Sequence, residues 1–116
     1  MMKYDNFFFP ADDLAASCSF YQDVLDLPVK FDFSENGMVA FQVGDEEAAI
    51  ILKERKKFPD MTPTVWIEVE DVQAKYAALQ GRNIRFLSEP FRIRTGWAVE
   101  FIDPSGNRLG FVDYRE

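Results

Sequence analysis

The chain has 116 residues, of which 47% are hydrophobic and 16% aromatic, and its formal net charge is −7. This length is typical of one domain, and the apolar content excludes an intrinsically disordered chain. The acidic charge argues against nucleic acid and anionic membranes as partners, because both are polyanions.

The first half of the sequence predicts a strand, a helix and three further strands. A Phe-rich run over Tyr4–Pro10 predicts a buried strand, and Asp12 or Asp13 caps the helix that follows. Four apolar residues at helical spacing predict one buried face of a helix that ends near Leu27-Pro28: Leu14, Cys18, Tyr21 and Leu25. Turn sequences then separate three predicted strands: Val29–Phe33, Met38–Val43 and Ala48–Lys53.

The second half repeats this order. A strand over Thr64–Val69 precedes the predicted cap Asp71, and Gly81 ends a helix whose apolar face is formed by Val72, Tyr76 and Leu79. Three strands complete the half: Ile84–Leu87, Trp97–Ile102 and Arg108–Asp113. The sequence therefore predicts one α+β domain over residues 1–116 with β-α-β-β-β repeats at about 1–57 and 58–116. We expect curved mixed sheets with a pocket between the halves.

Two local motifs and this repeat give the chain a family resemblance. The first motif is Asp13-Leu14 followed by Phe20-Tyr21-Gln22-Asp23-Val24-Leu25, and the second is Asp103-Pro104-Ser105-Gly106-Asn107. Both are similar to motifs of the glyoxalase/bleomycin-resistance/dioxygenase family of the vicinal oxygen chelate superfamily. The resemblance covers nearly the whole chain and implies that family's fold.

The resemblance also locates the positions at which metal-dependent members of the family hold a divalent ion. These positions fall on Asn6, Thr64 and Gly110, and near Ile50 with a register uncertainty of one residue. None of these residues supplies an imidazole or a carboxylate, whereas transition-metal sites need several such donors. A shift in register could add Asp5 or Glu68, but two acidic groups without histidine would hold such a metal poorly. We therefore expect no metal and no cofactor.

Alternation along the strands predicts which other side chains share the pocket face. Together with the four positions above, this face is predicted to carry Phe8, Trp66, Glu68, Ala98, Glu100, Ile102, Arg108 and Val112. Trp66 either fills the core or offers a stacking surface for a flat ligand. Glu100 either forms a structural ion pair with Arg108 or acts as a catalytic general base.

Three functions remain open at this stage. The first is a metal-independent binding protein for a small organic molecule, similar to the family's antibiotic-resistance proteins, with a cationic or aromatic ligand. The second is an enzyme, either a glyoxalase-like lyase or isomerase or a dioxygenase-related protein, and the third is a non-catalytic domain of a larger assembly. The single cysteine and the lack of a signal peptide or membrane span favour the cytoplasm. The apolar run Phe7-Phe8-Phe9 favours a homodimer, either plain or domain-swapped.

Overall fold

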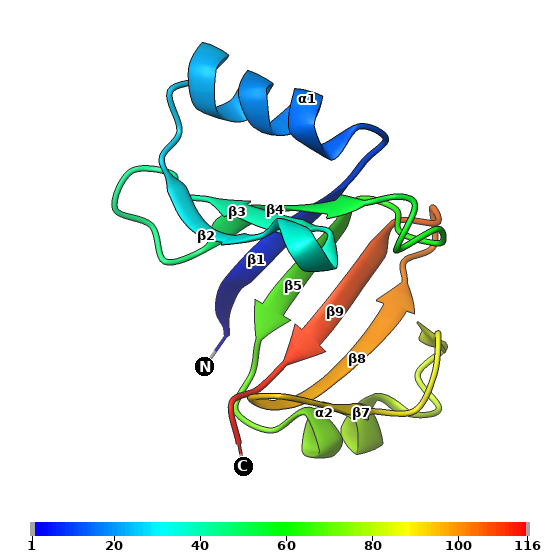
Figure 1. Ribbon diagram of the computed structural model, residues 1–116. Coiled ribbons are helices and arrows are strands. Elements are labelled where there is room, and N and C mark those ends of the chain that lie inside the picture. Colours follow the sequence, from blue (N-terminus) through cyan, green and yellow to red (C-terminus); the bar gives the residue numbers. More distant parts are fainter. Residues whose placement is uncertain (1, 116) are drawn as a thin grey trace. The chain divides into compact units, whose positions relative to one another are not determined.

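The computed structural model describes residues 2–115, which form two compact units (Figure 1). The N-terminal unit comprises Asn6–Pro63, and the C-terminal unit comprises the residues from Thr64 onward together with those up to Asp5. Each unit contains strands in mixed orientation and one α-helix, so the predicted α+β class is confirmed. In both halves a strand, a helix and further strands follow one another as predicted, and the second half contains one additional strand. No helix within residues 2–115 is both long and apolar enough to cross a membrane.

The N-terminal unit has the strand order β2-β3-β4-β1. Its strands are β1 (Lys3–Ala11), which belongs to this unit from Asn6 onward, β2 (Val29–Phe33), β3 (Met38–Phe41) and β4 (Ala49–Glu54), and β1 runs parallel to β4. Helix α1 (Leu14–Ser19) begins at Asp13, whose carboxylate accepts a hydrogen bond from the Ala16 N–H at 3.0 Å. Of the two predicted caps, Asp13 is therefore the one that caps the helix, and Asp12 pairs with Arg55 at 2.6 Å.

The predicted apolar helix face is wrong at its last residue. Beyond Ser19 the chain continues as a π-helical turn, Phe20–Val24, in which the Leu25 N–H donates to the Phe20 carbonyl. A π-helical turn contains more residues than an α-helical turn, so the spacing of three and four no longer keeps one face inward. Leu25 is consequently 46% exposed, whereas Leu27 packs against the core beside Tyr21.

The C-terminal unit has the strand order β5-β9-β8-β6, in which β5, β9 and β8 lie side by side (Figure 1). Its elements are β5 (Thr64–Glu68), α2 (Val72–Leu79), β6 (Arg85–Phe86), β7 (Phe91–Ile93), β8 (Gly96–Ile102) and β9 (Arg108–Val112). The predicted strand Ile84–Leu87 is shorter than expected, and β7 was not predicted. Both β6 and β7 pair with β8.

One face of the C-terminal sheet packs against α2. Val72, Tyr76 and Leu79 contact this core, which confirms the predicted apolar face of the second helix. Val99 and Phe101 lie in the same core, and Val39 at the corresponding place of the repeat is buried beside α1. Equivalent residues of the two repeats therefore bury the same side of each sheet.

Asp113 ties three backbone segments of the C-terminal unit together. Its side chain is almost fully buried and accepts hydrogen bonds from the Val72 N–H at 2.7 Å and the Trp97 N–H at 2.9 Å. Gly96 permits this packing, because a Cβ there would lie 2.1 Å from the carbonyl oxygen of Asp113. The carboxylate therefore links the first residue of α2 to the start of β8, and it supplements the cap at Asp71.

Candidate functional site

The C-terminal sheet has a second face, opposite α2, which we call the helix-free face. Strand pairing places Trp66 and Glu100 on either side of Gly110, and Thr64 and Ile102 on either side of Arg108. Residues paired in this way point to the same side of a sheet. The residues that alternation predicted for the helix-free face therefore share one side of the sheet, and three of them, Thr64, Ala98 and Val112, are buried. The full set is Thr64, Trp66, Glu68, Ala98, Glu100, Ile102, Arg108, Gly110 and Val112.

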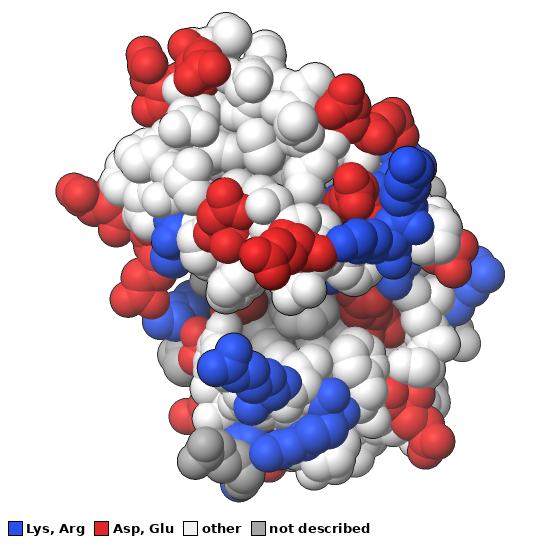
Figure 2. All heavy atoms as spheres, viewed as in Figure 1, with Lys and Arg blue, Asp and Glu red and all other residues white. Residues whose placement is uncertain are grey.

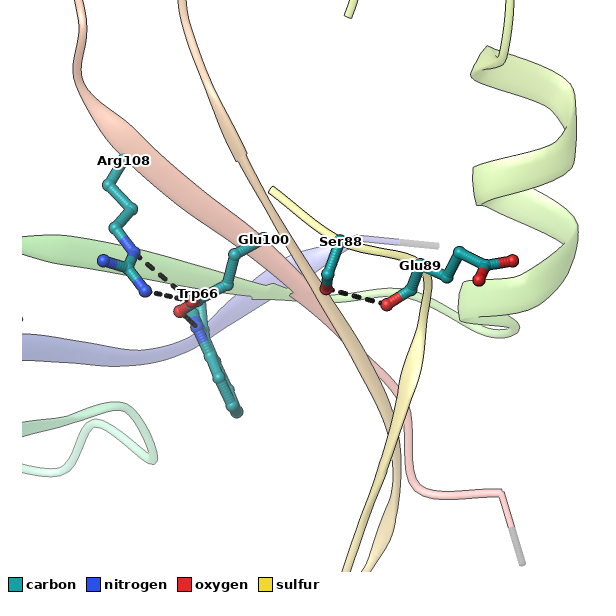
Figure 3. A network of polar contacts seen from close by, with 5 residues as sticks. All are labelled: Trp66, Ser88, Glu89, Glu100 and Arg108. Carbon is teal, nitrogen blue, oxygen red and sulfur yellow. Dashed lines mark hydrogen bonds and ion pairs between the residues drawn. The ribbon is translucent and has the colours of Figure 1, made fainter. Parts of the chain in front are cut away.

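The centre of the helix-free face is a network around the Glu100 carboxylate (Figure 3). One carboxylate oxygen accepts from the Trp66 indole N–H at 2.9 Å, and the other accepts from the Arg108 guanidinium at 2.6 Å. The side chains of Glu100 and Arg108 are 13% and 21% exposed. The predicted ion pair is thus present and largely desolvated, and both oxygens of the carboxylate are engaged.

Gly110 provides the space in which the Trp66 indole lies. A Cβ at position 110 would stand 2.7 Å from both Cδ1 and Nε1 of that indole, which is closer than real Cβ contacts allow. The pyrrole edge of Trp66 therefore rests directly on the backbone of β9. A position that the family resemblance assigns to a metal ligand is here a glycine beneath an indole ring.

The donor chemistry at the carried-over positions does not fit a transition metal. Gly110 offers no side chain, and Thr64 offers a hydroxyl group that is 3% exposed. Of the carboxylates on this face, Glu100 is held by Trp66 and Arg108, and Glu68 lies 3.8 Å from the Lys3 ammonium. Within residues 2–115 no three His, Cys, Asp or Glu side chains are grouped as a metal site would require.

In the N-terminal unit the structure places Asn6 and Phe8 on one side of β1 and Ile50 on the opposite side of the sheet. The Asn6 side-chain oxygen accepts from the Ala49 N–H at 3.0 Å, and Phe8 is buried with the Lys53 ammonium 4.9 Å from its ring centroid. Ile50 packs against the core beneath α1, so it lies on the opposite side of the strand from Ile51. Ile51 pairs with Phe8 and Ala49 pairs with Asn6, so both of these neighbours of Ile50 lie on the side of the sheet that carries Asn6 and Phe8.

Two cavities lie outside the helix-free face. One has a volume of about 340 Å³ beside the start of α2, and one of about 470 Å³ surrounds the turn after β2. The first faces helix N–H groups that Asp71 and Asp113 already cap. The second is lined by Asp32–Asn36, where hydrogen bonds from Ser34 hold the pKa of the Asp32 carboxyl below its usual value. Neither brings together groups that suggest a reaction or a specific ligand.

Two residues of the helix-free face were missed by the sequence analysis. Arg85 pairs with Ile102, and Phe91 pairs with Ala98, so both point to this side of the sheet. The signal for Phe91 was available, because Phe91 and Ile93 alternate with arginine and precede a two-residue turn at Arg94-Thr95. For Arg85 no comparable signal exists, since a charged residue on a two-residue edge strand resembles a loop.

Comparison with known proteins places these observations in a family context. A model of the Glyoxalase/Bleomycin resistance protein/Dioxygenase superfamily matches residues 3–111. A superfamily member from Vibrio splendidus 12B01 has a TM-score of 0.69 at 18% identity, with 97% of this chain and 98% of that chain covered. Methylmalonyl-CoA epimerase from Mycobacterium tuberculosis has a TM-score of 0.73 at 17% identity, with 97% and 88% covered.

A second epimerase gives the same result. Methylmalonyl-CoA epimerase from Streptomyces coelicolor, in complex with 2-nitronate-propionyl-CoA, has a TM-score of 0.72 at 18% identity, with 98% of both chains covered. Identities this low establish a common fold and no common activity. No curated protein matches the chain.

Proposed function

Because the chain belongs to the Glyoxalase/Bleomycin resistance protein/Dioxygenase superfamily, we propose that it binds a small organic molecule on the helix-free face without a metal ion. The observation that carries this proposal is the network that fixes Trp66. An indole held at its N–H by Glu100 and supported from below by Gly110 keeps one orientation. Trp66 is partly exposed as a residue, and an indole held in this way is a rigid surface on which a flat ligand can stack at little entropic cost.

The ion pair bears on the choice between a binding protein and an enzyme. A general base must accept a proton at a carboxylate oxygen, and both oxygens of Glu100 already accept hydrogen bonds. Each oxygen keeps a lone pair that could take a proton, but neutralising the carboxylate would leave the largely desolvated Arg108 charge without its partner, which is costly. The geometry therefore favours binding over an isomerase or lyase reaction that starts at Glu100.

Tryptophan fluorescence can test the binding proposal, since the chain has a matched pair of tryptophans. We would titrate the protein with a panel of planar aromatic acids, amides and amines. We expect a quench or spectral shift that survives Trp97→Phe and is lost in Trp66→Phe. The Trp97 ring packs against the α2 core, which makes Trp97→Phe the appropriate control. No response to any compound, or a response that persists in Trp66→Phe, would contradict the proposal.

Metal analysis tests the other half of the proposal. We expect purified protein to contain much less than one equivalent of transition metal per chain. We also expect ligand binding to be insensitive to prolonged treatment with a chelator. A tightly bound ion near one equivalent per chain would overturn metal-independent binding. It would also mean that donors other than Thr64, Glu100 and Gly110 hold the ion.

We also propose that the protein is a homodimer, although the surface that favours this differs from the one expected. In the run Phe7-Phe8-Phe9 one side chain, Phe9, is exposed, at 38%, and Phe8 is only 6% exposed, so this run offers less free apolar surface than its sequence suggested. Exposed apolar side chains gather instead on the π-helical turn, where Phe20, Val24 and Leu25 are 49%, 66% and 46% exposed. Light scattering at micromolar concentration should give twice the 13.4 kDa chain mass, and a value of 13.4 kDa would exclude the dimer.

A further inference from the structure

Arg85 occupies a fixed position at the border of the helix-free face. It lies on edge strand β6 opposite Ile102, which in turn lies opposite Arg108. The next residue, Phe86, points to the other side and packs on Tyr76 with a centroid distance of 4.7 Å. Because Phe86 anchors the strand from below, the backbone directs the Arg85 side chain over the helix-free face.

The other charges of the helix-free face are paired. Arg108 is neutralised by Glu100 at 2.6 Å, and Glu68 lies 3.8 Å from the Lys3 ammonium. Arg85 is exposed, and within residues 2–115 it has no ion pair. The face therefore carries a net positive charge, although the whole chain has a formal charge of −7. Basic side chains are also exposed on the visible side of the C-terminal unit (Figure 2).

The same ion pairs remove the reason for expecting a cationic ligand. That expectation depended on an acidic group beside an aromatic ring, but the Glu100 charge is already compensated by Arg108. Arg85 and Trp66 are three strand spacings apart and two residues apart in register, so their Cα atoms are separated by about 16 Å at about 4.8 Å per strand and about 3.3 Å per residue. Both side chains are long, and their ends can approach each other across Ile102 within the span of a small aromatic molecule.

From this arrangement, and on the basis of the function proposed above, we propose that the ligand is an aromatic molecule with an anionic substituent. Its ring stacks on Trp66, and its anionic group pairs with Arg85. A planar guanidinium matches the two oxygens of a carboxylate or the oxygens of a phosphate. Arg85 is thus a specificity-determining residue that selects anionic ligands over neutral and cationic ones of the same shape.

Fluorine NMR with four matched probes tests this assignment. The probes are 4-(trifluoromethyl)benzoate, the corresponding benzamide, the corresponding benzylamine, and 4-(trifluoromethyl)phenyl phosphate. Each is titrated into the full chain and into the variants Arg85→Gln, Arg82→Gln and Trp66→Phe. Arg82 is a matched control, because it is also an exposed arginine but precedes β6 in a loop.

We expect the two anions to bind more tightly than the amide, and the amine to bind most weakly. Arg85→Gln should weaken binding of the anions about tenfold, equivalent to about 1.4 kcal/mol, and should leave the amide unchanged. Arg82→Gln should change neither, and Trp66→Phe should weaken all probes that bind. A preference for phosphate over benzoate, or the reverse, identifies which anionic group the site takes.

The outcomes separate this inference from the proposed function. If the amide and the anions bind equally, or if Arg85→Gln and Arg82→Gln have equal effects, the role of Arg85 is refuted while binding at Trp66 stands. Tightest binding of the benzylamine refutes the anionic ligand class. If no probe binds the wild-type protein, both the proposed function and this inference are contradicted.

Discussion

Replacing Gly110 with alanine is the most direct perturbation of the helix-free face. The new Cβ would lie 2.7 Å from Trp66 Nε1, so the indole must retreat by about 1 Å to reach an ordinary contact distance. This movement stretches its 2.9 Å hydrogen bond to Glu100 beyond hydrogen-bonding range. Losing a hydrogen bond to a charged group costs about 1.5–3 kcal/mol, and alanine recovers about 0.4–1 kcal/mol by restricting the unfolded chain.

We therefore expect Gly110→Ala to lower the free energy of unfolding by about 1–2 kcal/mol, as measured by urea denaturation. In a Trp97→Phe background the emission maximum of Trp66 should also shift. The control is the same substitution in Trp66→Ala, where no indole remains and the nearest contact, Glu100 Cγ at 3.3 Å, needs only a small adjustment. Equal destabilisation in both backgrounds would refute the argument that Gly110 makes room for the indole.

Three further predictions concern other carboxylates and the thiol. Asp113→Asn turns one buried acceptor into a donor that faces a backbone N–H, and thermal unfolding should show a loss of about 2–3 kcal/mol in the free energy of unfolding. Asp71→Asn keeps an acceptor at an exposed cap and should change the free energy of unfolding by less than about 1 kcal/mol. Hydrogen bonds within its turn hold the pKa of the Asp103 carboxyl below its usual value. The stabilisation that results is present above the unfolded-state pKa of about 3.9 and is lost as the pH falls through the folded-state pKa. Asp103→Asn should therefore reduce the loss of stability in acid, and an unchanged pH dependence of the unfolding free energy in acid would contradict this. Burial, and secondarily the Asp32 charge, raises the pKa of the Cys18 thiol, so a disulfide reagent at pH 8 should react with it more slowly in the folded protein than in urea, and equal rates would contradict the assignment.

Much of the fold followed from patterns that act locally. Strand alternation, the Asp13 and Asp71 caps and the apolar face of α2 depend on neighbours within a few residues, and all of them are confirmed. The outward orientation of the Leu25 side chain was not predictable in the same way. A π-helical turn has no distinctive composition, and it places Leu25 outward through a hydrogen bond to Phe20 rather than through its own polarity.

Most residues of the helix-free face were predictable, Arg85 was not, and the mutual arrangement of these residues was only partly so. Alternation and the repeat placed Glu100 beside Arg108, because cross-strand neighbours follow from the pairing of β8 with β9. The hydrogen bond from Trp66 to Glu100 depends on how an indole lies over a glycine on the strand between them. That contact follows from three-dimensional packing, and no spacing in the sequence encodes it. Arg85 likewise required the pairing of β6 with β8.

The bond between Val72 and Asp113 also sets an order of events during synthesis. The first residue of α2 relies on a carboxylate that follows it by 41 positions. Ribosomes add about 5–20 residues per second, so this acceptor emerges roughly two to eight seconds after the helix. An eight-residue helix is marginal in water by itself. During that interval α2 has only its local cap at Asp71, so the nascent C-terminal unit completes its fold after the end of β9 has left the ribosome.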